Sequence, residues 1–294
     1  MGRGLRRFGF VAVLVAVAIA MTAPPGGSSQ ADLEQVRASA EHTLAQRSAR
    51  IAGVVDTTTI DGKTIHIPVN GKFDFQHGRG IMNVDFAQIP ELKNVEVPGF
   101  TLLFVNDSIY IEIGSLLNVQ DVPKKLEGKR WVEEKVPQYG GSESVTGVPS
   151  SDPTASLAAL RGVSDIQLVG SQPVRRVMTD HYRGVVDVKA AIDAVPPEDR
   201  AVVEGGMVTF GSTLPIDVWL DRDGVVRKVA MTLSALGPGG VYVESRTEME
   251  YYDFGTRVSV TAPPRRQVID YAEFQKIMTR AGGTTSGQGS APTV

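Results

Sequence analysis

The stretch from Pro215 to Val229 reads PIDVWLDRDGVVRKV and constrains the fold more than any other part of the chain. Apolar and polar residues alternate on both sides of Asp223-Gly224, and this period of two is typical of strands with one buried face. Asp-Gly favours a tight hairpin turn because glycine tolerates the positive φ that such turns need. The sequence therefore predicts two antiparallel strands, 215–221 and 225–234.

Similar alternating segments, separated by Gly, Asn, Asp and Pro, occur along most of the chain. Their turns are predicted at Asp61-Gly62, Asn70-Gly71 and Asn106-Asp107, and each segment has one apolar side. The further predicted strands lie at 49–60, 64–69, 72–75, 80–86, 100–105, 108–113, 128–132, 165–168, 173–178, 181–188 and 241–254.

Helices are predicted between these groups of strands. From Asp32 to about Arg47, apolar residues recur on one helical stripe, and Asp32 with Gln35 forms a candidate capping box. Asp152-Pro153 supplies an N-cap and a first-turn proline for a second helix. Shorter helices are predicted at 115–119, 189–194, 197–203 and 265–279. Strands and helices that share one apolar layer predict an α+β fold, in which a curved antiparallel sheet has helices on its concave face.

Two segments resemble a known family. Residues 152–188, reading DPTASLAALRGVSDIQLVGSQPVRRVMTDHYRGVVDV, and the hairpin at 215–229 are similar to the LppX/LprG-type lipoproteins of actinobacteria, whose fold is like that of LolA. The resemblance implies a half-barrel closed by helices, with a hydrophobic cavity between sheet and helices. It also implies lipid binding and transport without catalysis.

In that reading, acyl chains occupy the place of core side chains on the apolar face of the sheet. The residues predicted to line the cavity are Met82, Val84, Phe86, Ile109, Ile111, Ile113, Val186, Val218, Leu220, Val229, Met231 and Leu233. His181-Tyr182 also matches the family, but an aromatic pair at the start of a strand is expected to pack locally. Trp219 lies on the polar phase of its strand and is expected either to cover the outer face or to stack under a crossing loop.

The N-terminus reads as an export signal. Arg3, Arg6 and Arg7 precede an uninterrupted apolar run, Phe8 to Met21, which is shorter than the roughly 20 residues that span a bilayer. Cleavage is expected after Ala20 or after Ala31. The predicted organisation is a signal and spacer at 1–31, one lipid-binding domain at 32–264, and a C-terminal helix with a disordered tail at 265–294.

The chain has no cysteine, which excludes disulfides, thiolate metal sites and a cysteine nucleophile. It also departs from the lipoprotein pattern, because no lipidated cysteine follows the signal. We therefore expect a protein that is secreted, or retained in the cell envelope without an acyl anchor.

The remaining motifs give little support for a metal site or a catalytic site. The four histidines lack zinc-ligand spacing, Trp219 interrupts a calcium-like run of aspartates, and no Gly-x-Ser-x-Gly is present. With 33 acidic residues against 30 basic ones, no nucleic-acid partner is expected. The sequence predicts a protein that is not an enzyme and holds no cofactor or metal.

The function predicted is a carrier for a lipid, lipoglycan or other acylated molecule between the membrane and the outer envelope. Its expected partners are that ligand, the membrane surface during transfer, and envelope transport proteins, with residues 114–151 or mobile helices as a gate. One alternative is a non-catalytic envelope scaffold with a solid core. Another is a regulatory ectodomain, if Phe8–Met21 stays uncleaved.

Overall fold

Twelve strands of the described chain form one continuous sheet. The computed structural model describes residues 29–58, 62–86, 99–114, 124–135, 153–193, 212–236 and 242–280. The order across the sheet is β12-β6-β5-β4-β3-β2-β1-β11-β10-β9-β8-β7. Neighbouring strands are antiparallel, except that β12 runs parallel to β6.

The elements are α1 (Gln30–Leu44), β1 (Ser48–Thr58), β2 (Thr64–Asp74), β3 (Arg79–Val84), β4 (Phe100–Val105), β5 (Ser108–Glu112), η2 (Lys124–Leu126), β6 (Trp131–Lys135), α3 (Pro153–Ala159), η3 (Leu160–Gly162), β7 (Val163–Val174), β8 (Val177–Asp187), α4 (Val188–Asp193), β9 (Thr213–Leu220), β10 (Val226–Leu236), β11 (Tyr242–Tyr252), η6 (Arg265–Gln267), β12 (Val268–Asp270) and α6 (Tyr271–Arg280).

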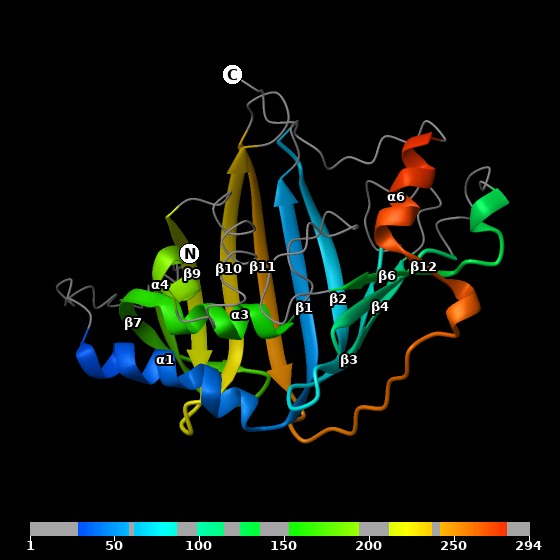
Figure 1. Cartoon of the computed structure of the whole chain (residues 1–294). Helices are drawn as coiled ribbons and strands as arrows, with labels where there is room; N and C mark the ends of the chain where they lie inside the picture. The colour runs from blue at the N-terminus through cyan, green and yellow to red at the C-terminus, as the bar shows by residue number, and fades with distance from the viewer. Residues whose placement is uncertain are drawn as a thin grey trace, which may run out of the picture.

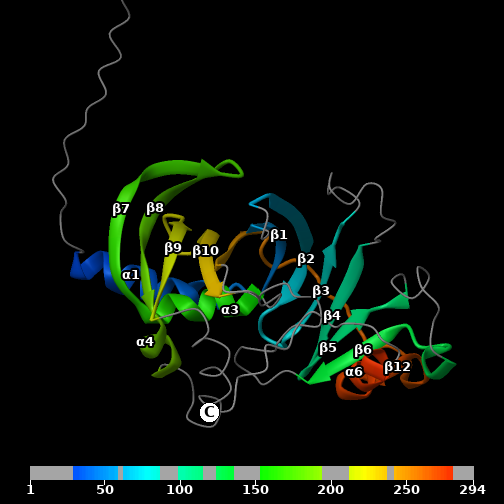
Figure 2. The same ribbon diagram turned by 90° about the horizontal axis from the view of Figure 1, so that it is seen from above.

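The sheet is curved into an arch, and α1 and α3 lie on its concave side (Figures 1 and 2). At one end, the long β7–β8 hairpin bends back over the convex side (Figure 2). At the other end, α6 packs against β6 and β12. The architecture confirms the predicted α+β half-barrel.

Strand register separates the two faces. Directly paired residues share a face, and one row that crosses the concave face from β8 to β4 is almost entirely apolar. It contains Tyr182, Val218, Val229, Met249, Gly53, Val69, Val84 and Phe100. The neighbouring row on the convex face is mostly polar and contains His181, Trp219, Lys228, Glu250, Ala52, Asn70, Asn83 and Thr101. The apolar core therefore lies on the concave side of the sheet.

Two glycines in the middle of the sheet make room for methionine side chains. A Cβ on Gly53 would lie 2.7 Å from Met249 Sδ, and one on Gly71 would lie 2.7 Å from Met82 Sδ. Each methionine lies directly opposite its glycine on the neighbouring strand. The predicted turn at Asn70-Gly71 is therefore wrong, because both residues lie inside β2 and Gly71 is kept for this close approach.

One other predicted turn and one predicted strand differ from the structure. Between β9 and β10 the connection runs from 221 to 225, longer than the predicted Asp-Gly turn, because Asp221 Oδ1 accepts hydrogen bonds from the Asp223 and Val225 amides at 3.0 Å each. The predicted strand 173–178 contains the β7–β8 turn. There Arg175 and Arg176 take φ of 45° and 73°, values that sequence patterns assign to Gly or Asn.

The N-terminal helix follows its predicted stripe, with Leu33, Val36 and Ala40 buried. Its N-cap is Ser29, whose hydroxyl accepts from the Asp32 amide at 3.0 Å, so the capping box predicted at Asp32 is wrong by three residues. Helix α3 begins at Pro153 as predicted. The predicted helices at 115–119 and 197–203, the export signal and the C-terminal tail lie outside the described residues. Of the predicted gate at 114–151, only residues 114 and 124–135 are described, and they include η2 and β6.

The chain after β11 crosses the sheet to its far edge (Figure 1). In this crossing segment, 253–264, the Gly255 amide donates to Ser48 O at 2.9 Å, and Lys72 Nζ donates to Arg257 O at 3.3 Å. The segment leads into η6 and the edge strand β12. The predicted helix at 265–279 is therefore wrong at its start, because residues 268–270 pair with β6 and the helix begins at Tyr271.

Candidate functional site

All twelve residues predicted to contact a ligand lie in, or against, one apolar cluster. Nine are buried at 9% exposure or less, whereas Phe86, Met231 and Leu233 are half-buried. The structure thus brings the predicted residues together on the concave side. It also separates them into side chains that are fully enclosed and side chains that are open to further contact.

Helices α1 and α3 cover the lower part of the concave face, as Figure 1 is oriented. Thr43 of α1 accepts a hydrogen bond from the Val226 amide at 2.9 Å, and Tyr251 of β11 donates to the Pro153 carbonyl of α3 at 2.8 Å. Both helices contact β10, and α1 also contacts β9. Val218, Leu220 and Val229 therefore belong to the core beneath these helices.

Nearer the top of the strands in Figure 1, a second concave row has a different character. It runs through Ile216, Met231, Thr247, Val55 and Ile67, which are paired in this order from β9 to β2. Ile216 and Val55 are each 1% exposed, whereas Met231 and Ile67 are half-buried. We call these five residues the upper row.

Thr247 is the one polar residue in the upper row. It is 7% exposed, and its hydroxyl has no hydrogen-bond partner within the part of the chain that the structure describes. The adjacent concave row contains a second polar position, where Thr57 and Ser245 are paired and their hydroxyls lie 3.3 Å apart. The sequence pattern did not identify Thr247. Its position between Ser245 and Met249, on the same phase of β11, could have indicated a polar side chain on the concave face.

The methionines over Gly53 and Gly71 give this face an adaptable surface. Methionine is unbranched and polarisable, and it fits irregular apolar partners at little strain. Met249 and Met82 are 3% and 1% exposed, and each lies where a glycine leaves space above the backbone. The middle of the concave face thus holds two unbranched side chains packed over glycine backbone.

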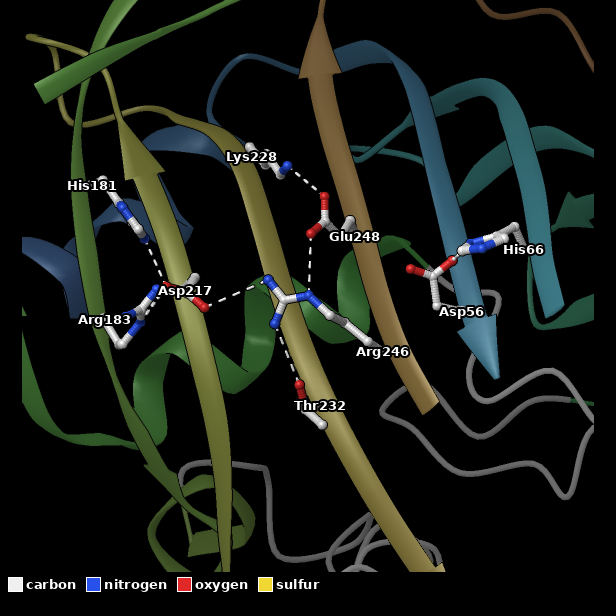
Figure 3. Close-up of polar contacts among 9 residues, drawn as sticks. All are labelled: Asp56, His66, His181, Arg183, Asp217, Lys228, Thr232, Arg246 and Glu248. Atoms are coloured by element: carbon white, nitrogen blue, oxygen red, sulfur yellow. Dashed lines mark hydrogen bonds and ion pairs between the residues drawn. The ribbon is translucent and has the colours of Figure 1, made fainter. Parts of the chain in front are cut away.

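The convex face carries a polar network centred on Asp217 of β9 (Figure 3). Asp217 Oδ1 accepts from His181 Nε2 at 2.7 Å and from Arg183 Nε at 2.9 Å, and Arg246 lies 3.6 Å from Oδ2. Burial alone would raise the pKa of Asp217, but the hydrogen bonds from His181 and Arg183 outweigh it and lower the pKa below its usual value. The carboxylate thus stays ionised and joins β8, β9 and β11.

The same network continues along β10 and β11. Glu248 forms ion pairs with Lys228 and with Arg246, and these bonds lower its pKa against the opposing effect of burial. Farther across the face, His66 Nδ1 lies 2.7 Å from Asp56 Oδ1 (Figure 3). Acidic and basic side chains alternate across the strands, so their ion pairs link neighbouring strands and stabilise the sheet.

The β7–β8 hairpin is fixed onto this convex face. His181 stacks on Trp219 with ring centroids 4.2 Å apart, and Trp219 forms a small apolar cluster with Val174 and Ala230. Near the hairpin turn, Arg175 pairs with Glu250 and lies 3.8 Å from the ring centre of Tyr252. The outer-face position expected for Trp219 and the local packing expected for His181 are confirmed.

A smaller polar cluster lies on β5 and β6. Glu133 Oε1 accepts from Tyr110 at 2.9 Å and from Ser108 at 3.0 Å, and Lys135 lies 3.1 Å away. Burial, followed by the hydrogen bond to Glu133, raises the pKa of the Tyr110 hydroxyl. Ser108 Oγ also accepts a hydrogen bond from Lys135 Nζ at 2.8 Å, so its hydroxyl is held between the carboxylate and the ammonium group.

The described residues include no group of three or more His, Cys, Asp or Glu side chains able to hold a metal ion. Among the described helices, none is long and apolar enough to cross a membrane.

Comparison with known proteins gives relatives in sequence and in structure. No family model matches the chain. Over 195 residues it is 27% identical to an uncharacterized 31.2 kDa protein of Streptomyces griseus from the rplA-rplJ intergenic region, covering 63% of this chain and 59% of that protein. The chain thus spans less than two thirds of the length of this relative.

Solved structures with a similar fold include two mycobacterial proteins. LprF from Mycobacterium bovis matches with a TM-score of 0.46 and 16% identity, covering 81% of this chain and 99% of LprF. The lipoprotein LppX from Mycobacterium tuberculosis matches at 0.42 and 15%, covering 80% of this chain and all of LppX. A LolA superfamily protein from Nitrosomonas europaea matches at 0.29 and 11%, covering 79% and 95%. All three matches lie below a TM-score of 0.5.

Proposed function

We propose that this protein is an exported, non-catalytic carrier that binds the acyl chains of a lipid, lipoglycan or other acylated molecule against the concave face of its sheet. The observation that carries the proposal is the upper row, where half-buried apolar side chains continue the core of the concave side beyond α1 and α3. The LppX/LprG-like and LolA-like architecture supports the same class of function.

Burial of hydrocarbon supplies the binding free energy in this mechanism. Each methylene removed from water contributes about 0.8 kcal/mol, so a single long acyl chain can be held with few polar contacts. Half-buried Met231, Leu233 and Phe86 offer such contacts directly. Met82 and Met249 let the wall adapt to chains of different length and saturation.

The carrier would act by binding and release and not by covalent chemistry. The basic and apolar N-terminal segment supports export, and the absence of cysteine favours a protein that moves freely between the membrane and the outer envelope. The membrane surface and envelope transport proteins would then be transient partners.

The test compares adjacent substitutions on opposite faces of β10. Met231→Asp places a carboxylate on the concave side, whereas Thr232→Asp places one on the convex side, where Thr232 Oγ1 accepts from Arg246 at 3.4 Å. Delipidated full-length protein is titrated with a pyrene-labelled phosphatidylcholine and with a pyrene-labelled diacylglycerol. We expect uptake by the wild type and by Thr232→Asp, and loss of uptake by Met231→Asp.

Solvent extraction of the protein as purified complements this titration, because native cargo is then identified by mass spectrometry. Failure of the wild type to take up either probe, together with an extract free of acylated molecules, would contradict the proposal. That result would favour the alternative of a scaffold with a solid core.

A further inference from the structure

The buried hydroxyl of Thr247 lowers the stability of the protein without a ligand. Burial of a hydroxyl without a hydrogen-bond partner is unfavourable, because the group loses its bonds to water and gains none in return. Thr247 is 7% exposed and unpartnered among the described residues. By contrast, the buried hydroxyls of Thr43 and Thr179 donate to the carbonyls of Ser39 and Gln172 at 2.7 and 2.6 Å.

The surroundings of Thr247 show where a partner would come from. On its own face it is paired with Met231 on one side and with Val55 on the other, and neither side chain can accept a hydrogen bond of ordinary strength. The next polar groups on this face, the hydroxyls of Ser245 and Thr57, lie within 3.3 Å of each other. None of these neighbours gives Thr247 an acceptor, whereas a polar atom of a molecule bound along this row would.

We infer that Thr247 is a specificity-determining residue of the proposed lipid site, and that it donates a hydrogen bond to the ester carbonyl of a bound acyl lipid. This inference rests on the proposed function. A carbonyl oxygen is a good acceptor at the start of an acyl chain, whereas an ether oxygen is a poor one and a plain hydrocarbon has none. In apolar surroundings such a bond is stronger than in water. Thr247 thus favours ester-linked lipids over ether-linked ones.

The same placement gives the bound lipid a direction. The concave row next to Thr247 holds the paired hydroxyls of Ser245 and Thr57, so the headgroup points toward them. Across the sheet, Val55 is paired with Ile67. Ile67 and Phe86, which lies two residues beyond β3, both pack against the apolar core. The acyl chain therefore extends from Thr247 across β1 and β2 toward Phe86.

The experiment measures binding of two probes to delipidated full-length protein. The probes are 1,2-dioleoylglycerol and its di-O-oleyl ether counterpart, which carry the same chains and differ at the linkage. The variants are Thr247→Val, which removes the hydroxyl at nearly constant shape, and the control Thr179→Val, whose hydroxyl lies in the β7–β8 hairpin. We expect the wild type and Thr179→Val to prefer the ester by roughly three- to tenfold, the value of one hydrogen bond.

Thr247→Val is expected to lose this preference through weaker ester binding, with ether binding unchanged. An unchanged ester preference in Thr247→Val, or no preference in the wild type, would overturn the inference while leaving the carrier function intact. Failure of the wild type to bind either probe would overturn the inference, and together with a solvent extract free of acylated molecules it would overturn the carrier function as well.

Unfolding of the empty proteins adds a second readout that does not depend on lipid. Because Thr247 has no internal partner to lose, Thr247→Val should unfold at the same urea concentration as the wild type or a higher one. Thr179→Val should unfold at a lower concentration. An equal loss of stability in both variants would show that Thr247 is satisfied within the protein, which would also overturn the inference.

Discussion

Asp217→Asn tests whether the convex network stabilises the fold. Asp217 accepts two charged hydrogen bonds, from His181 and Arg183, and hydrogen bonds to charged groups contribute about 1.5–3 kcal/mol each. The Arg183 side chain is 65% exposed, so it can return to water at little cost. The His181 side chain is only 9% exposed and loses its anionic partner. We therefore expect a loss of about 2–3 kcal/mol in the free energy of unfolding.

The assay is urea unfolding at neutral pH, followed by circular dichroism and by the fluorescence of the two tryptophans. Asp56→Asn is the matched control, since Asp56 pairs with His66 at 2.7 Å on the same face but the His66 side chain is 67% exposed. We expect this control to cost less than about 1 kcal/mol. Equal stability of Asp217→Asn and the wild type would refute the reasoning.

The effect of Asp217→Asn also depends on pH. The bonds to Asp217 lower its pKa in the folded state, whereas an unfolded aspartate titrates near about 3.9. The stabilisation is therefore present above about pH 4 and is lost as the pH falls through the lowered folded pKa. The gap between the wild type and Asp217→Asn should narrow on acidification from about pH 6 to about pH 3. A gap of constant size across that range would contradict this account.

Two further substitutions test the backbone. Gly71→Ala should lower the free energy of unfolding, measured with urea, by about 1–3 kcal/mol or more, because its Cβ would lie 2.0 Å from the Ile81 carbonyl oxygen. The control Gly114→Ala should be nearly neutral, because its Cβ would meet only the Arg130 side chain, at 3.3 Å. Arg176→Gly should raise the free energy of unfolding by about 0.5–1 kcal/mol, since an exposed residue at φ 73° gives up its strain; a lower stability would show that the arginine side chain makes a compensating contact.

The sequence predicted the strands well where one face is buried and the other is wet. The alternation through Ile109 and Ile111, and the turn at Asn106-Asp107, led directly to β4 and β5. The pattern failed where local signals competed with tertiary packing. Asn70-Gly71 resembles a turn locally, yet the partner that fills the space at Gly71 is Met82, and pairings of this kind cannot be inferred from one segment alone.

The candidate site divides in the same way. Apolar periodicity placed all twelve predicted residues on one face, because that face is set by the period of two. It could not separate residues beneath α1 and α3, such as Val218, from half-buried ones, such as Met231. Apolar periodicity also did not identify Thr247 or the acceptor role of Asp217, because the hydrogen bonds of a polar side chain depend on partners from strands that are distant in sequence.

The crossing segment 253–264 has a consequence for how the arch can move. It leaves the middle of the sheet at β11, is bonded to Ser48 and Lys72 on the way, and continues into β12 at the edge farthest from β7. Widening the arch would lengthen this path and strain those bonds, whereas displacing a helix would not. Flattening of the strands would therefore act on the bonds of this segment and on the pairing of β12 with β6, whereas movement of the covering helices would act on the Thr43–Val226 and Tyr251–Pro153 hydrogen bonds.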